Sequence, residues 1–197
     1  MSLIALIDKH KTDLAVSWEA GTQEVVDKYR AFGSELVQLP SFTYSRENMK
    51  VAVSHMMDLG FNRHARYDVA AYAMRRSALE AVPDVSAREE IWRLSELAHL
   101  GSGEDLGGPR LKEATADYVH RVGKAKVEQY LLMVQEGFKA VATEIDAVYQ
   151  IAKVAHANPK LDKKAKLIAD QAAENHGQHI ALEKMQLDDI LEIVRSL

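Results

Sequence analysis

Two histidines and a glutamate near the carboxyl end of the chain are the residues whose types and spacing best suit chemistry. His176, His179 and Glu183 follow one another at intervals of three and four residues, so in a helix their side chains share one face. Imidazole and carboxylate groups together are ligands for zinc, iron or manganese. One helix supplies only half of such a site, because carboxylate metal centres in helical bundles draw their ligands from several facing helices.

The other ligands would have to come from elsewhere in the chain. Glu96 and His99 form a Glu-x-x-His, a motif that two helices each contribute in ferritin-like carboxylate proteins; here the second copy is missing. Glu174 could assist. Because about one acidic-x-x-His is expected by chance in a chain of this composition, the motif alone carries little weight. The predicted metal set is Glu96, His99, His176, His179 and Glu183.

The metal candidates near the carboxyl end interrupt an apolar stripe that predicts a long helix there. The stripe has helical spacing and consists of Ile168, Ala172, Leu187, Ile190, Val194 and Leu197. Polar residues at positions where core residues are expected indicate either a polar site inside a bundle or a helix that extends past its partners. Charged residues seldom stay buried unless they are paired or bound to metal, which favours solvated or simply hydrogen-bonded side chains over a metal site.

The pair Asn158-Pro159 predicts a reversal of the chain, because the residue before proline is pushed out of helical geometry. Apolar residues recur at helical intervals before it, over residues 111–156, and after it, over residues 161–197. Two long helices joined by a short turn form an antiparallel hairpin. In a simple register about this turn, the three metal candidates are level with Val141, Phe138 and Val134. That face is apolar and weighs against metal binding.

Five shorter helices are expected before the hairpin. Helical periodicity places them at about residues 2–20, 22–39, 45–59, 62–81 and 86–100. Ser86 and Glu89 have the spacing of a capping box at the start of the last one. Gly123 and Gly137 are positions where the first arm of the hairpin could bend. No segment alternates apolar and polar residues like a strand. We therefore expect an all-α antiparallel helical bundle, with a multi-helix region at 1–108 and the hairpin at 109–197, together forming one domain.

Composition and charge narrow the class of protein. The chain has 197 residues, a net charge of -4 and 47% hydrophobic content, which is ordinary for a soluble globular protein. Its acidic balance argues against general capture of nucleic acid or anionic membrane. The absence of cysteine excludes disulfides, thiolate nucleophiles and cysteine-bound metals, and fits the reducing cytoplasm. No apolar run is long enough for a membrane span.

Two further features have both a chemical and a structural interpretation. Basic side chains cluster twice, and arginine forks suit phosphate or carboxylate groups. Because acidic residues are interleaved with both clusters, ion pairing between helix surfaces is favoured over nucleotide binding. The clusters are Arg63, His64, Arg66, Arg75 and Arg76, and later Lys112, Arg121, Lys124 and Lys126. The glycine-rich loop at 101–108 follows a helix and lacks the Gly-Lys-Ser/Thr ending of a P-loop, so we interpret it as a connector.

The function that the sequence favours is non-enzymatic. Val127 and Leu131 lie off the main apolar stripe, so the helix around them is apolar on two faces, and other helices of the chain or a second subunit must cover both. We expect an α-helical interaction or assembly subunit that binds a protein partner or itself through long amphipathic helices, without nucleic acid, membrane or cofactor. The alternative is a ferritin-like helical-bundle metal-binding protein or metal-dependent oxidoreductase that holds iron, manganese or zinc on the predicted metal set.

Overall fold

The computed structural model of the chain is built from α-helices. It describes residues 1–15, 23–43, 45–101, 107–157, 163, 167 and 178–197, without the side chains of 46, 63, 64, 67, 99–101, 107, 142–157 and 178–185. No strand occurs in these ranges, which confirms the all-α prediction, and none of their helices is long and apolar enough to cross a membrane. The helices are α1 (Leu3–Lys9), α2 (Lys11–Leu14), α3 (Gln23–Val37), α4 (Arg46–Asp58), α5 (Arg63–Leu79), α6 (Val85–Gly101), α7 (Gly107–Val122), α8 (Lys124–Ala157) and α10 (Gln178–Ser196).

Polar side chains begin three of the helices where the sequence places a start. Ser2, Ser45 and Asn62 each accept a hydrogen bond from the backbone N–H three residues further on, at 3.2, 3.2 and 2.8 Å. Such caps satisfy backbone donors that have no partner within the helix. The starts of α1, α4 and α5 are therefore encoded locally.

The start of α6 differs from the expected capping box. The helix begins at Val85, and the Asp84 carboxylate accepts the backbone N–H of Ala87 at 3.2 Å. Asp84 is therefore the cap, while Ser86 already lies inside the first turn. The Glu89 side chain is held by the side-chain amide of Gln38 from α3.

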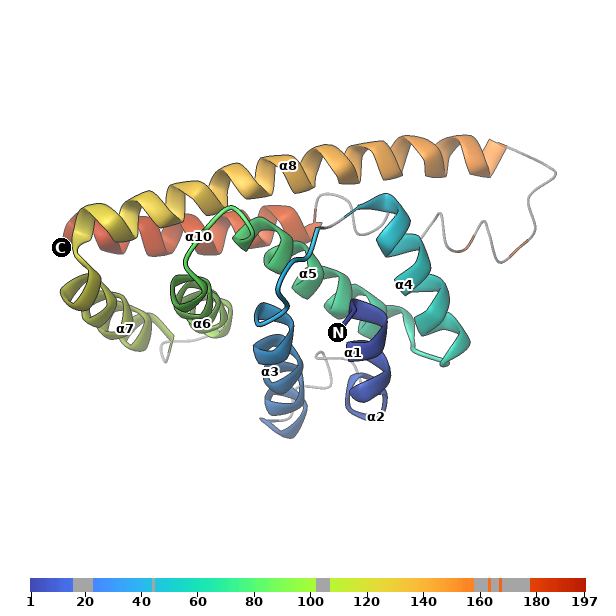
Figure 1. Ribbon diagram of the computed structural model, residues 1–197, viewed down its shortest axis with the longest axis horizontal. Helices are drawn as coiled ribbons and strands as arrows, with labels where there is room; N and C mark the ends of the chain where they lie inside the picture. Colours follow the sequence, from blue (N-terminus) through green and yellow to red (C-terminus); the bar gives the residue numbers. More distant parts are fainter. Residues whose placement is uncertain (16–22, 44, 102–106, 158–162, 164–166, 168–177) are drawn as a thin grey trace.

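Gly123 separates two helices, although the helical spacing of apolar residues continues across it and predicts a single helix. α7 ends at Val122 and α8 begins at Lys124. Between them Gly123 has a φ of +96°, a left-handed conformation that residues with a side chain rarely adopt. Its N–H still bonds to the carbonyl oxygen of Val119 at 2.8 Å, so α7 ends in an abrupt corner. Figure 1 shows α7 turned away from the axis of α8.

The helices are arranged around a long rod formed by α8. Figure 1 shows α8 along one edge of the molecule, α10 beside it, and the remaining helices all on one side of this pair. α5 packs along α8, and α10 contacts α5, α6, α7 and α8. α1 packs on α3 and α4, which in turn pack on α5, and α4 also contacts α8; a single hydrophobic core connects all the groups.

The carboxyl-terminal helix is part of this core. Leu187, Ile190 and Val194 from the predicted apolar stripe are buried, as is Leu191, whereas Leu197 is exposed. Ile168 and Ala172, the other two members of the stripe, lie outside the described residues. Burial of one face of α10 against four other helices makes it a structural element rather than an appendage.

Two glycines allow helices to approach closely. A Cβ atom built on Gly137 of α8 would lie 2.2 Å from the backbone oxygen of Ala78 in α5, so these two helices meet at the glycine. A Cβ atom on Gly33 of α3 would lie 2.7 Å from the ring of Tyr72 and 2.8 Å from that of Trp92. Gly137 therefore serves close packing and does not end the helix, in contrast to Gly123.

Candidate functional site

Of the predicted metal set, the structure describes the side chain of Glu96 alone. Its Oε1 accepts the indole N–H of Trp92 at 3.0 Å. The side chains of His99, His179 and Glu183 lie outside the described part of the chain. His176 and the possible helper Glu174 lie outside it entirely. Among the described side chains, no group of three or more His, Asp or Glu is placed to hold a metal ion. The metal site therefore stays a prediction.

The described parts of α8 and α10 run antiparallel in a defined register. Gln135 Nε2 donates to Asp188 Oδ1 at 2.8 Å, and Arg195 Nε donates to Glu128 Oε1 at 2.8 Å. A turn centred on Asn158-Pro159 would instead have placed Asp188 level with Gln129, so the register differs by six residues from the expected one. The turn itself lies outside the described residues.

This register changes which part of α8 lies beside the metal candidates. Continued along the backbones of the two helices, it brings position 183 level with Ala140 and position 179 level with Glu144. The face expected opposite His179 and Glu183 was apolar, with Phe138 and Val134 level with them. An acidic residue of α8 is therefore level with His179.

Both apolar faces of the first half of α8 are covered by the chain itself. Val127 and Leu131, which lie off the main stripe, are fully buried, and Val134 and Phe138 on the main stripe are buried as well. The sequence leaves open whether other helices of the chain or a second subunit cover the two apolar faces of α8. For this half, helices of the same chain cover both. No second subunit is needed to cover it.

Within the described residues, the second half of α8 extends past α10. α8 has 34 residues, and by the observed register the first residue of α10, Gln178, is level with Ile145. The segment from there to Ala157 is about 18 Å long at 1.5 Å per residue. Figure 1 shows it continuing beyond α10, on the side of the molecule where α4 lies.

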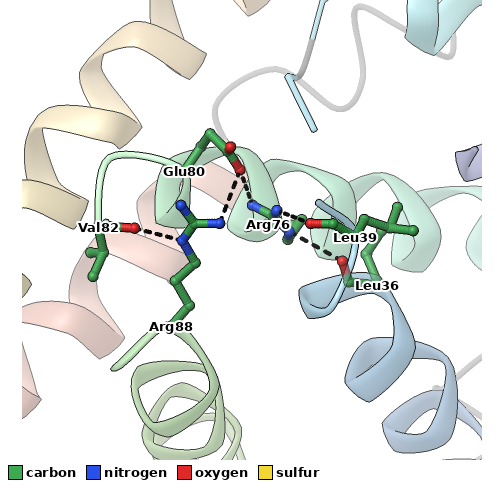
Figure 2. A network of polar contacts seen from close by, with 6 residues as sticks. All are labelled: Leu36, Leu39, Arg76, Glu80, Val82 and Arg88. Carbon is green, nitrogen blue, oxygen red and sulfur yellow. Dashed lines mark hydrogen bonds and ion pairs between the residues drawn. The ribbon is translucent and has the colours of Figure 1, made fainter. Parts of the chain in front are cut away.

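Two members of the basic cluster in α5, Arg75 and Arg76, are buried in the core, while the side chains of Arg63 and His64 lie outside the described part of the chain. The Arg76 side chain is fully buried; its Nε donates to the carbonyl oxygen of Leu36 at 3.1 Å and its Nη2 to that of Leu39 at 2.6 Å. Glu80 Oε2 lies 2.5 Å from Nη1 and balances the charge (Figure 2). Because the last carbonyls of a helix lack partners within it, Arg76 satisfies the carboxyl end of α3.

Arg88 extends this network from α6. Its Nε donates to the carbonyl oxygen of Val82 at 2.5 Å, and its Nη1 lies 3.6 Å from Glu80 Oε2 (Figure 2). Burial lowers the pKa of Arg76, and the Glu80 carboxylate opposes that shift. The expected ion pairing is present, but inside the fold: it joins α5 to α6 through Glu80, while the hydrogen bonds of Arg76 attach α3.

Arg75 has a different environment on the same helix. Its guanidinium carbon lies 5.4 Å from the ring centroid of Tyr72 and 5.0 Å from that of Trp92, and the side chain is buried. Stacking of a planar guanidinium on aromatic rings is a packing contact with an electrostatic component. Neither arginine of this pair presents a free fork to a phosphate.

The sequence did not reveal a polar groove at the corner between α7 and α8, which we call the Tyr118 groove. It has a volume of about 430 Å³. Its lining comes from the start of α6, the end of α7 and the start of α8: Asp84, Ser86, Ala87, Glu89, Glu90, Tyr118, Arg121, Val122, Lys126 and Tyr130. Arg121 and Lys126 belong to the second basic cluster, but their convergence on residues 84–90 depends on the corner at Gly123, which the apolar pattern does not show.

Comparisons of the chain with protein-family models, with curated proteins and with solved structures found no match. The function is therefore proposed from the geometry of the molecule.

Proposed function

We propose that the protein is a non-enzymatic assembly subunit that pairs with a second copy of itself through the second half of α8. The observation that carries this proposal is that, among the described residues, α10 reaches only as far as Ile145 along the 34-residue α8. α10 has 19 residues and lies beside the first part of the 34-residue α8. A helix that continues past its partner with an apolar stripe gains stability when another helix covers that stripe.

The sequence of the second half of α8 provides such a stripe. Ile145, Val148, Ala152 and Ala155 are spaced by three, four and three residues, which is the spacing of a helix-pairing seam. Small alanines at two of the four positions allow two helices to approach closely. The register of α10 leaves positions 146–157 of α8 beyond Gln178, the first residue of α10 that the structure describes.

Charges along this segment favour an antiparallel pair of identical chains. Glu144 and Asp146 precede the centre of the stripe, and Lys153 and His156 follow it. When position 148 of one copy is level with position 152 of the other, the acidic end of each copy meets the basic end of its partner. A parallel pair would bring like charges together. A two-fold symmetric contact of this kind closes on itself and yields a dimer.

Charge reversal tests this pairing. In the antiparallel dimer Asp146 of one copy is level with position 154 of the other, one residue away from Lys153. Asp146→Lys alone, or Lys153→Asp alone, should therefore weaken dimerisation about tenfold or more. The double variant restores opposite charges and should regain dimerisation. Light scattering across a concentration series measures the effect, as a change from about 44 kDa for the dimer to the 22.0 kDa of one chain.

Glu136→Lys provides the matched control, because it makes the same change of charge on an exposed part of α8 that pairs only with Lys139 among the described residues. It should leave the molar mass unchanged. A wild-type chain that remains a strict monomer at all concentrations would refute self-association. If the wild type, Asp146→Lys, Lys153→Asp and the double variant all dimerise equally well, the antiparallel arrangement is refuted.

Metal binding is a second candidate, favoured by the register of α8 and α10. Because Glu144 rather than an apolar residue is level with His179, an acidic ligand is available on the facing helix. Under this alternative, elemental analysis of the purified protein should find iron, manganese or zinc in a stoichiometric amount. The His176→Ala/His179→Ala double variant should lose it. Absence of metal from the wild-type protein would eliminate this candidate.

A further inference from the structure

We propose that the Tyr118 groove binds a small ligand through a carboxylate or phosphate group. The groove is separate from the proposed dimer contact, since Lys126 and Val148 are 22 residues apart on α8, about 33 Å along the helix. Its function can therefore succeed or fail independently of self-association.

The hydroxyl group of Tyr118 is the first observation that points to a ligand. Tyr118 is 2% exposed, and its hydroxyl oxygen is buried without a hydrogen-bond partner in the described part of the chain. Buried polar groups in folded proteins are almost always hydrogen-bonded. The groups that act electrostatically on this hydroxyl include Tyr130, Glu90 and Asp84, all of which line the groove. Tyr118 and these three residues thus line the same groove.

Two cations of the groove lie over its aromatic rings. The Arg121 guanidinium carbon is 5.7 Å from the ring centroid of Tyr118, and the Lys126 ammonium is 5.6 Å from that of Tyr130. Within the described residues, the Lys126 ammonium has no carboxylate partner within 4.0 Å. An ammonium group above an aromatic ring at the edge of a groove retains the capacity to bind an anion.

The carboxylates of the groove are already engaged by the chain itself. Glu90 is shared by two arginines, Arg121 at 3.1 Å and Arg93. Asp84 caps α6 through the Ala87 N–H, and Glu89 is held by Gln38. The Tyr118 hydroxyl and the Lys126 ammonium, in contrast, are donors without a hydrogen-bond partner among the described residues, which favours an anionic ligand over a cationic one.

The local electrostatics support the same choice. Burial raises the pKa of the Tyr118 hydroxyl to about 12, and the carboxylates of Glu90 and Asp84 act in the same direction. The hydroxyl is therefore protonated at neutral pH and available as a donor. The groove also contains the amino-terminal turn of the 17-residue α6, whose dipole favours negative charge. A volume of about 430 Å³ suits a small organic acid or phosphate ester.

Titration calorimetry with inorganic phosphate and with citrate tests this proposal, using sodium chloride at matched ionic strength as the reference. At least one of the two probes should bind with saturation. Phosphate binding without citrate binding would assign a phosphate-bearing ligand, and the reverse would assign a carboxylate. No saturable binding of either probe would overturn the proposal.

Two variants connect such binding to the groove. Tyr118→Phe removes only the unpartnered hydroxyl, and Lys126→Met removes the ammonium; each should weaken binding about tenfold. Lys112→Met, an exposed change on α7, is the control and should bind normally. Tyr118→Phe should also fold at least as stably as the wild-type protein, whereas a structural role for the hydroxyl would make it less stable. Binding that both groove variants leave unchanged would contradict the assignment.

Discussion

Replacement of Arg76 by methionine is expected to lower the free energy of unfolding by about 3–5 kcal/mol, because it breaks a buried charge network by removing one partner. The fully buried guanidinium donates to the carbonyls of Leu36 and Leu39 and to Glu80. Methionine fills much of the same volume but donates no hydrogen bond. The two carbonyls and the carboxylate would then be left without these donors, and the carboxyl end of α3 would lose its attachment to α5. Urea denaturation measures the loss.

Two further substitutions make this result interpretable. Glu80→Gln keeps every helix but removes the negative charge between Arg76 and Arg88, and should cost about 1–3 kcal/mol. Lys139→Met removes an exposed pair with Glu136 and should change stability by less than about 1 kcal/mol. A loss below about 1 kcal/mol for Arg76→Met would contradict the role assigned to this network.

Gly137→Ala is expected to lower the free energy of unfolding by about 2 kcal/mol, even though alanine is the better helix former. In an open helix the substitution would stabilise the chain by about 1 kcal/mol. Here the added Cβ would lie 2.2 Å from the backbone oxygen of Ala78, and a backbone atom cannot rotate away as a side chain can. α5 and α8 would have to separate along their contact, which exposes core residues.

Gly108→Ala is the matched control, since nothing lies within 4 Å of a Cβ built there. It should change the free energy of unfolding by less than about 0.5 kcal/mol. Thermal and urea denaturation of both variants give the comparison. Stabilisation by Gly137→Ala would show that α5 and α8 are not in close contact at this glycine.

Local signals in the sequence were sufficient for much of the fold. The helical spacing of apolar residues places α4 and α5 close to their observed limits, whereas the single helix expected at about 2–20 is divided at His10 into α1 and α2. The burial of Ile190 and Val194 follows from the same periodicity. These features depend on neighbours within one or two helical turns, which a sequence pattern contains.

Features that depend on contacts between distant segments were not accessible from the sequence. From the sequence, Gly123 and Gly137 are both interpreted as possible bends of one helix. In the structure Gly123 separates two helices, whereas Gly137 allows close contact with Ala78. The choice depends on what lies opposite each glycine. The register of α8 and α10 likewise depends on pairs such as Gln135 and Asp188, and not on the position of a turn-forming proline.

The candidate sites divide in the same way. The predicted metal set is defined by spacing within single helices, and most of its side chains lie outside the described part of the chain. The Tyr118 groove joins residues of three helices through the corner at Gly123, so no single segment contains its signal. Arg76 could not be assigned to the core from the sequence, because only the folded chain places the Leu36 carbonyl beside it.

Disulfide trapping provides the most direct test of antiparallel self-association through α8. The chain has no cysteine, so Ile145→Cys and Ala155→Cys each introduce a single thiol. In the antiparallel pair position 145 of one copy is level with position 155 of the other, while identical positions are about 15 Å apart along the axis. A disulfide requires Cα atoms closer than about 7 Å.

We predict that an equimolar mixture of the two variants, dissociated and reassembled before oxidation, forms a disulfide-linked heterodimer on a non-reducing gel, while each variant alone remains uncrosslinked. Leu132→Cys, at an exposed position in the first half of α8, should not crosslink under the same conditions. Crosslinking of each variant with itself and not with the other, or no crosslinking in the mixture, would contradict the proposed assembly.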